Sequence, residues 1–553
     1  MYRKGLLCSF WLLAAMALAA GAAPSVLAGV ASTSAAALQS ALAAPPGDCG
    51  IAAGDARHRE TALLDSLYGV ADYALLWRDE ERYEALIGAL DGLVDDGLDP
   101  AAYGVLRLRQ LRGQAGGDAE LICRDLLASR AYLTALHHLN HGVLDGQALE
   151  PLWRDARANV ADLFPAPADA LTTLAEEGLV DVAAAFQRAR PDMVRYHRLR
   201  AAHGAWRERL RFVNWPELPP GAALKPGMDD ARIPVLRARL AAEGLVRAGA
   251  DNPGSGGPVA EQAHFDDGLA KAVEDFQRRY RLKVDGIVGG ETLREMNLPR
   301  AFRQDQIRAN LERLRWLWRD MAPRMVLVDI AGAGVSYYQG GEAVWEARAQ
   351  VGMGSRPTPA LKSHITHLTF NPPWTVPPTI YRHDKLPEIR KDIGYLAKNR
   401  IRVLDRDGRE LDPHGIDWNA PGAIVLRQDA GPKSALGLVA FRFPNPFAVY
   451  LHDTPNQQLF ASHQRMFSSG CVRVESAMTL ADLLFAGAGD EELARIAAIK
   501  ASGRTRNVDL PSPVPLLMAY LTVGVDGEGE LEFRPDIYRL DGALVAALRA
   551  VER

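Results

Sequence analysis

A cysteine and a histidine near the C-terminal end of the chain have the residue types of a nucleophile and its base. Cys471 follows the run 468–470 (Ser-Ser-Gly), which predicts a tight turn with little side-chain bulk around the sulfur. His452 follows the apolar run 447–451, which predicts a strand end. The thiolate is the nucleophilic form of cysteine, and an imidazole can accept the thiol proton. The plain alternative is a buried structural cysteine and an unrelated histidine.

The first 28 residues have the pattern of a secretory signal peptide, 1–28. Residues 1–4 give a short basic start, and residues 5–20 are apolar apart from Cys8 and Ser9. This apolar stretch is short for a membrane span, and small residues follow it as candidate cleavage sites. Residues 29–56 are rich in Ala, Ser, Gly and Pro, which predicts a flexible lead-in. We therefore expect an exported protein, in which any unpaired thiol meets oxidising conditions.

Cysteine usage favours a working thiol at Cys471. The chain has four cysteines, and loss of Cys8 with the signal peptide would leave an odd number. Cys49 and Cys123 both lie in the N-terminal third and could form a disulfide. Cys471 would then be the free thiol, and a chain that keeps one in an oxidising compartment is expected to use it.

Several motifs resemble those of L,D-transpeptidases with a YkuD-type catalytic domain, enzymes that remodel peptidoglycan. The match begins at the Cys471 signature and is similar to the large, multi-domain, YcbB-like members over about residues 63–538. One position departs from the family, since many small members carry an auxiliary histidine where this chain has Ser469. His452 remains to serve as base. The other motifs that carry the resemblance are Asn371-Pro372-Pro373-Trp374-Thr375-Val376-Pro377, Val425-Leu426-Arg427-Gln428, Ala435-Leu436-Gly437 and Phe443-Pro444-Asn445-Pro446.

The resemblance implies an acyl transfer through a cysteine thioester. Cys471 would attack the diaminopimelate carbonyl of a donor stem tetrapeptide and expel D-alanine. The amine of a second stem peptide would then take the acyl group, and water as acceptor would instead give an L,D-carboxypeptidase. The resemblance also implies acylation of Cys471 by carbapenems and no cofactor or metal. Export by the signal peptide predicts a periplasmic location, where the protein could associate with the cell wall or the inner-membrane face. Other wall-synthesis proteins are possible partners.

Five further residues are candidates for the site. Gly470 and Ser469 are expected at the turn, where backbone N–H groups could hold an oxyanion. Arg473, two residues after the cysteine, could clamp a substrate carboxylate or else pair with Glu475. Tyr450 could point into the same pocket or into the core, and Trp374 could line a donor groove or be ordinary core.

The group that orients His452 would be a backbone carbonyl or Asp453, whose side chain could equally stabilise a turn.

The fold class predicted is multi-domain α+β. Helical periodicity over 57–224 predicts a scaffold domain, and residues 225–299 a small helical domain. Two apolar stripes are expected in the core of that small domain: Ile233, Leu236 and Leu240; Leu269, Val273, Phe276 and Tyr280. Within the same domain, residues 276–293 resemble the repeat of peptidoglycan-binding domains, with a small helical domain without a ligand as the alternative. A connecting helix is expected in 300–322. Residues 323–553 predict a mainly β, sandwich-like catalytic domain.

Within the catalytic domain, strands are expected at 325–330, 335–338, 344–351, 423–426, 438–443 and 448–451, with a final hairpin over 516–533. Residues 381–422 are charged and partly helical, and we expect them to form a lid insert. A helix is expected at 476–485 with Ser476 as its cap.

Two other classes of function stay open beside this one. The chain could be a wall-binding scaffold with weak or no catalysis, or a secreted thiol protease, although a protease would be expected to need a fuller Cys/His/Asn set. His137 and His141 could bind a metal from one helix face, but no third ligand is evident. The charge is nearly balanced, with 64 basic and 68 acidic residues, so nucleic-acid binding is not implied.

Overall fold

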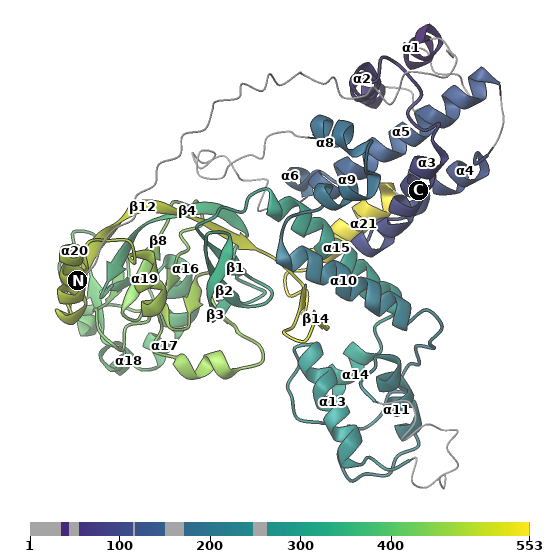
Figure 1. Cartoon of the computed structure of the whole chain (residues 1–553). Helices are drawn as coiled ribbons and strands as arrows, with labels where there is room; N and C mark the ends of the chain where they lie inside the picture. Colours follow the sequence, from purple (N-terminus) through teal and green to yellow (C-terminus); the bar gives the residue numbers. More distant parts are fainter. Residues whose placement is uncertain (1–34, 44–54, 114–116, 150–170, 247–262, 552–553) are drawn as a thin grey trace, which may run out of the picture.

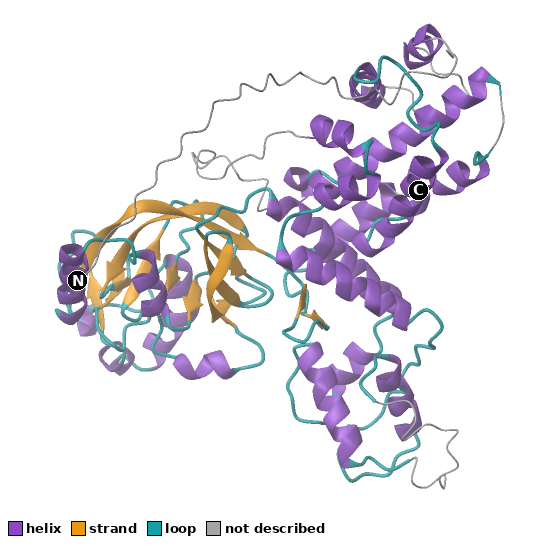
Figure 2. Cartoon of the chain, in the orientation of Figure 1, coloured by secondary structure: helices purple, strands orange, loops and turns teal. Residues whose placement is uncertain are grey.

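The computed structural model describes residues 35–43, 55–113, 117–149, 171–246 and 263–551. The described chain has a helical N-terminal region, a smaller helical unit and a β-rich domain (Figure 1, Figure 2). The multi-domain α+β class is therefore confirmed. The predicted signal peptide and Cys49 lie outside the described residues.

The N-terminal region is built almost entirely from helices. Part of the lead-in that we expected to be flexible forms helix α1, whose Leu38 and Leu42 are buried against the helices that follow. The expectation of flexibility was wrong there, because apolar residues at helical spacing give this segment a face to bury. The elements are α1 (Ala35–Ala43), α2 (Asp55–Gly69), α3 (Glu80–Asp91), η2 (Gly92–Asp96), η3 (Pro100–Tyr103), α4 (Val105–Gln110), α5 (Asp118–His141), α6 (Gly146–Leu149), α8 (Leu171–Gly178), α9 (Val182–Ala189) and α10 (Val194–Arg209).

Helix α15 (Arg300–Trp318) connects the helical region to the β-rich domain. Its Arg308 donates to the Gly97 carbonyl at 2.9 Å, and its Glu312 accepts the Leu144 N–H at 2.9 Å. Its Asn310 donates to Thr522, beside the catalytic sheet, at 2.7 Å. These contacts support the expected connecting helix, since one helix bonds to both neighbours.

The small helical unit consists of α11 (Ile233–Ala242), α13 (Asp267–Arg279) and α14 (Gly290–Met296). The Gln277 side chain accepts the N–H groups of Asp285 and Gly286, both at 2.9 Å. Gly286 has φ +67°, a conformation that favours glycine. The repeat-like motif is therefore a brace for the turn between α13 and α14. The two predicted apolar stripes are confirmed as core: Ile233, Leu236 and Leu240; Leu269, Val273, Phe276 and Tyr280.

Nine strands form the sheet of the β-rich domain, in the order β10-β3-β11-β9-β8-β4-β12-β1-β2. An additional pairing joins β2 to β3, so the sheet closes on itself rather than forming two separate layers. Its strands are β1 (Met325–Asp329), β2 (Gly334–Gln339), β3 (Glu342–Gly352), β4 (Leu361–Phe370), β8 (Val439–Arg442), β9 (Leu451–His452), β10 (Met466–Ser468), β11 (Val472–Val474) and β12 (Arg506–Ala519).

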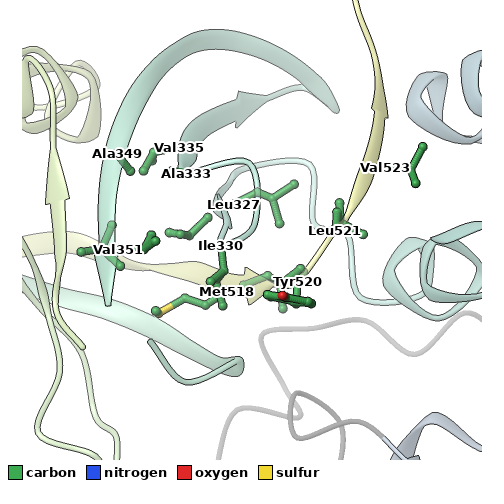
Figure 3. Packing of buried hydrophobic residues seen from close by; sticks show 14 of the residues in the cluster. Leu327, Ile330, Ala333, Val335, Ala349, Val351, Met518, Tyr520, Leu521 and Val523 are labelled. Carbon is green, nitrogen blue, oxygen red and sulfur yellow. The ribbon is translucent and has the colours of Figure 1, made fainter. Parts of the chain in front are cut away.

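The interior of this sheet is filled where β1, β2, β3 and β12 meet. Figure 3 shows Leu327, Val335, Val351 and Met518 converging there. Two helices, α19 (Ala477–Leu484) and α20 (Asp490–Ala501), follow the last site strand, β11. The helix expected at 476–485 is present, but Ser476 has φ +53° and its side chain makes no cap hydrogen bond.

The insert 381–422 that we expected as a lid is part of a larger subdomain, which spans residues 374–428 and which we call the lid. Its three-stranded sheet has the order β5-β7-β6, with β5 at Trp374–Thr375, β6 at Ile401–Leu404 and β7 at Val425–Gln428. We expected residues 423–426 in the catalytic sheet, but Val425 and Leu426 belong to β7, the strand that pairs with β6 and β5 instead. Strand pairing between distant segments is not visible in local sequence, which explains the difference. The lid helices are α16 (Pro378–Ile380), η5 (Tyr381–Lys385), α17 (Leu386–Lys391) and α18 (Gly394–Lys398).

The C-terminal segment leaves the catalytic sheet and returns to the helices. Strands β13 (Val523–Val525) and β14 (Leu531–Phe533) pair only with each other, so the expected hairpin forms outside the main sheet. Phe533 stacks on Tyr280 of the small helical unit with ring centroids 5.2 Å apart. Helix α21 (Asp541–Val551) packs on α15 (Figure 1). The last residues therefore join all parts of the described chain.

Candidate active site

The site lies on one face of the pairing between β9 and β11. These parallel strands place Leu451 opposite Val472, and both side chains are fully buried in the core. His452 stands opposite Arg473 and therefore lies on the other face. Strand alternation puts Tyr450 and Cys471 on that same face. Four of the predicted site residues are thus brought together.

His452 is oriented by a backbone carbonyl. Its Nδ1 lies 2.5 Å from the carbonyl oxygen of Asp453. A carbonyl can only accept, so Nδ1 carries the proton and Nε2 keeps its lone pair. Burial, together with the Arg473 charge, lowers the pKa of His452 to about 3. The imidazole is therefore neutral and able to accept a proton at ordinary pH.

The side chain of Asp453 has a separate task. It accepts the Leu438 N–H at 2.9 Å and the Gln457 amide at 3.1 Å. It therefore stabilises the turn after β9, and the backbone carbonyl is the group that orients the imidazole. Sequence reasoning had left both readings open.

Cys471 is a partly buried free thiol. The Tyr450 hydroxyl hydrogen-bonds to it, and the Arg442 guanidinium lies 4.3 Å from the centre of the Tyr450 ring. Burial raises the pKa of Cys471 despite these groups. The resting site therefore holds a neutral thiol and a neutral imidazole rather than an ion pair.

The turn before the cysteine is fixed by Ser468, a residue that sequence reasoning did not single out. Its Oγ accepts the Gly470 N–H at 3.1 Å and donates to the Cys471 carbonyl at 2.5 Å. Gly470 has φ +113°, so glycine is needed there. Its N–H is already used, which argues against it as an oxyanion donor. The Cys471 N–H has no acceptor in the described part of the chain.

A second brace reaches this turn from the C-terminal segment. Thr358 donates to the Gly470 carbonyl at 2.9 Å and accepts the Gly352 N–H at 2.8 Å. Tyr538 in turn accepts the Thr358 N–H at 3.0 Å and donates to the Gly352 carbonyl at 2.6 Å. Neither residue has a local sequence signal, because both act through contacts between distant segments.

Ser469 contacts an arginine rather than the cysteine. Its Oγ accepts from Arg356 at 2.8 Å. The same guanidinium makes two bonds to Asp384 of the lid, at 2.6 and 2.7 Å. The position at which the resembled family often carries an auxiliary histidine thus lies at the contact between the lid and the turn 468–471.

Arg473 has an amide partner and no carboxylate partner in the described chain. Its Nη1 donates to Gln350 at 3.1 Å, and its buried Nε has no acceptor there. Glu475, the neighbour that could have paired with it, instead pairs with Arg348. A partly buried guanidinium whose buried Nε lacks an acceptor is costly unless an anion arrives, so Arg473 is suited to hold a carboxylate.

Trp374 lies apart from these residues, in the lid. It packs against the lid's apolar core, and the ammonium of Lys385 lies 5.6 Å from its ring centre. This location agrees with the core alternative for Trp374. Its role in binding a donor stays a proposal.

The described residues contain no group of three or more side chains suited to a metal ion. His137 and His141 stack on each other with ring centroids 4.5 Å apart, and His138 bonds to the Tyr103 hydroxyl at 2.9 Å. Cys123 is disulfide-bonded, and Cys49, the partner that the sequence suggested for it, lies outside the described residues. No helix in the described ranges is long and apolar enough to cross a membrane.

This fold and site define a multi-domain protein with a cysteine and a histidine on one sheet face. Three family models match its separate parts. Residues 323–489 match the L,D-transpeptidase catalytic domain, YkuD. Residues 62–202 match the scaffold domain, and residues 232–296 match the "Putative peptidoglycan binding domain". The chain therefore carries a YkuD-type L,D-transpeptidase catalytic domain, and the resemblance seen in the sequence is confirmed.

One curated relative, from Haemophilus influenzae, is described as a "Putative L,D-transpeptidase". It is 37% identical over 219 residues, which cover 39% of this chain and 44% of the relative. The match thus spans less than half the length of that protein. A solved L,D-transpeptidase from Xylanimonas cellulosilytica is 15% identical with a TM-score of 0.17, covering 55% of this chain and 100% of that chain. At that TM-score the likeness says nothing further about this chain.

Proposed function

We propose that this protein is a peptidoglycan L,D-transpeptidase that joins diaminopimelate residues of two stem peptides through a thioester on Cys471. One observation carries the proposal: the free thiol shares a sheet face with an imidazole whose Nδ1 is held by a carbonyl. The matched catalytic domain supports the same reaction class.

The first half of the reaction forms the thioester. The Cys471 sulfur attacks the carbonyl carbon of diaminopimelate in the donor stem, and its proton passes to Nε2 of His452. The C–N bond to D-alanine breaks, and the imidazolium gives that proton to the leaving amine. Because both groups start neutral, the proton moves as the sulfur attacks. The unbonded Cys471 N–H is a candidate donor to the oxyanion.

The second half returns the enzyme to its starting state. The side-chain amine of the acceptor stem attacks the thioester carbon and loses a proton to His452. The C–S bond breaks, and the thiolate regains a proton from the imidazolium. Water in place of the amine would release a tripeptide and make the same site an L,D-carboxypeptidase. We propose Arg473 as the clamp for a stem carboxylate during both halves.

The proposal is tested with purified protein and a carbapenem, followed by intact-mass measurement. We expect one covalent adduct on the wild-type chain and none on Cys471→Ala, which should unfold at the same temperature as wild type. A Cys471→Ala protein that still forms the adduct would remove this thiol from the role.

The acceptor is tested with donor tetrapeptide, with and without an added second stem. A cross-linked dimer that depends on Cys471 supports the transpeptidase. Release of tripeptide alone in the presence of excess acceptor would assign the carboxypeptidase instead. If the wild-type protein binds wall fragments but forms neither product, the chain is a wall-binding scaffold.

A further inference from the structure

A six-residue loop, 353–358, contacts three separate parts of the β-rich domain, and we call it the clasp loop. It follows the last residue of β3, Gly352, and a side chain on Gly352 would collide with the Arg356 carbonyl at 2.3 Å. The loop is therefore packed too tightly against its own start to move freely. At its end, Thr358 holds the Gly470 carbonyl, as described above.

Arg356 of the clasp loop donates hydrogen bonds both to the lid and to the turn 468–471, which we call the nucleophile turn because it leads to Cys471. Two N–H groups bond the two oxygens of Asp384, and Nη1 also reaches Ser469 Oγ at 2.8 Å. A paired guanidinium and carboxylate fix each other's plane as well as their distance. The bond from Arg356 lowers the pKa of Asp384, so the carboxylate stays charged.

Asp384 belongs to a part of the fold that has its own core. It lies in η5, and the lid around it packs on a separate apolar cluster that includes Val376, Ile389 and Val403. The lid therefore has an apolar core of its own, and we call the surface where it meets the rest of the β-rich domain its seat. The Arg356–Asp384 pair is a contact across that seat.

We propose that Arg356 is a positioning residue that couples the seat of the lid to the geometry of the nucleophile turn through Ser469. When Asp384 is in place, the guanidinium plane is fixed and its remaining donor holds Ser469, two residues before the sulfur. When Asp384 is displaced, Arg356 is released and the turn loses one of its supports. The inference depends on the proposed function only for the identity of the nucleophile.

The ordinary alternative is an isolated, partly exposed ion pair, with 23% and 35% of the two side chains accessible. Such pairs contribute little to stability and would not change the reactivity of a thiol. The two readings therefore differ in one measurable quantity, which is the coupling between Asp384 and Ser469.

The experiment measures two rate constants for Cys471 in the full chain: acylation by a carbapenem and alkylation by iodoacetamide. The variants are Asp384→Asn, Ser469→Ala, their combination, and Arg356→Lys. The last keeps the positive charge but loses the two parallel N–H donors of the guanidinium. Asp429→Asn is the matched control, because Asp429 pairs with Arg402 at 2.6 Å elsewhere in the lid. Thermal unfolding is followed for every variant.

We expect Asp384→Asn to slow acylation by about fivefold or more, the usual size of a coupling between sites. The unfolding temperature should stay unchanged, and Asp429→Asn should behave as wild type. In the Ser469→Ala background, Asp384→Asn should have no further effect on the rate, because the hydrogen bond from Arg356 to Ser469 is already lost. Arg356→Lys should be as slow as Asp384→Asn.

Wild-type rates in Asp384→Asn or in Arg356→Lys would overturn the inference, and so would independent, multiplicative effects of the two substitutions. Failure of the proposed function looks different. In that case even the wild-type chain forms no carbapenem adduct, while alkylation of Cys471 still reports whether Asp384 and Ser469 are coupled.

Discussion

His452 and Arg473 lie opposite each other in the parallel pairing of β9 with β11, on the face that also carries Cys471. The cation beside the imidazole adds to the effect of burial, and the pKa of His452 falls to about 3. The proposed base is therefore neutral without help from substrate. Its proton sits on Nδ1, bonded to the Asp453 carbonyl, which leaves Nε2 for the thiol.

In the wild-type protein, the rate constant of acylation should not fall as the pH drops through the ordinary histidine pKa of about 6.5. Since the folded pKa of His452 lies below that value, the neutral imidazole persists as pH falls and is lost only near pH 3. The rate constant of carbapenem acylation should therefore be flat from about pH 5 to about pH 7. A tenfold fall across that range, with the protein still folded, would contradict a buried neutral base.

His452→Ala should lose most acylation near neutral pH, by about 100-fold or more. The loss should shrink as pH rises, because Cys471 then ionises without a base. Burial raises the pKa of this thiol, so the recovery should come at high pH. Acylation rates from pH 6 to pH 10 measure this, with His463→Ala as a control from an exposed loop. If His452→Ala keeps most of its neutral rate, the assigned base is wrong.

Ser469→His, which installs the residue common in small family members, should leave acylation unchanged or slow it. The larger ring would occupy the place where Arg356 now donates to the serine hydroxyl. Acylation rates and unfolding temperatures of the variant and wild type test this. Faster acylation by the histidine variant would show that the turn can use an auxiliary imidazole.

Tyr538→Phe should slow acylation of Cys471, although Tyr538 lies far from it in sequence. The change keeps the ring that stacks on Tyr520 but leaves the Gly352 carbonyl and the Thr358 N–H without their partner. We expect a loss of about 1 to 2 kcal/mol in unfolding free energy, as for other unmet buried polar groups. Tyr73→Phe, which removes an exposed hydroxyl bond to Asp65, is the control. Equal acylation rates in wild type and Tyr538→Phe would show that this brace does not position the thiol.

The small helical unit should contribute to wall binding through a groove of about 1450 Å³ that it shares with the loop leading to β10. Lys271 and Lys283 line the groove and are 61% and 70% exposed. Reversing both charges, Lys271→Glu with Lys283→Glu, should weaken sedimentation with insoluble peptidoglycan because stem peptides are anionic. Carbapenem acylation should stay the same, and Lys225→Glu in the same unit is the control.

A deletion of residues 225–299 should also weaken wall binding more than acylation. It has a side effect, since it uncovers Phe533 where the Tyr280 ring now stacks. The charge variants avoid this problem. Undiminished sedimentation by both the charge variants and the deletion would retire the wall-binding role of this unit.

The sequence by itself determined the nucleophile candidate, its base candidate and the order of domains. Cys471 and His452 could be found because a Ser-Ser-Gly-Cys turn and an apolar run ending in histidine are local patterns. The core stripes of the small unit, such as Leu269 and Val273, follow helical periodicity and were predicted correctly. Strand β4, with buried Leu361, Ser363 and Ile365 alternating along it, was a local signal that we missed.

Only the tertiary structure decided what surrounds the thiol. Arg356, Asp384, Thr358 and Tyr538 come from segments far from Cys471 in sequence, and each reaches the nucleophile turn directly or through one partner. The lid sheet, the closure of β2 on β3 and the return of α21 to the helices are likewise pairings between distant segments. Local residue patterns fix helices, strands and turns. Which of them meet depends on how the whole chain buries its apolar faces and pairs its polar groups.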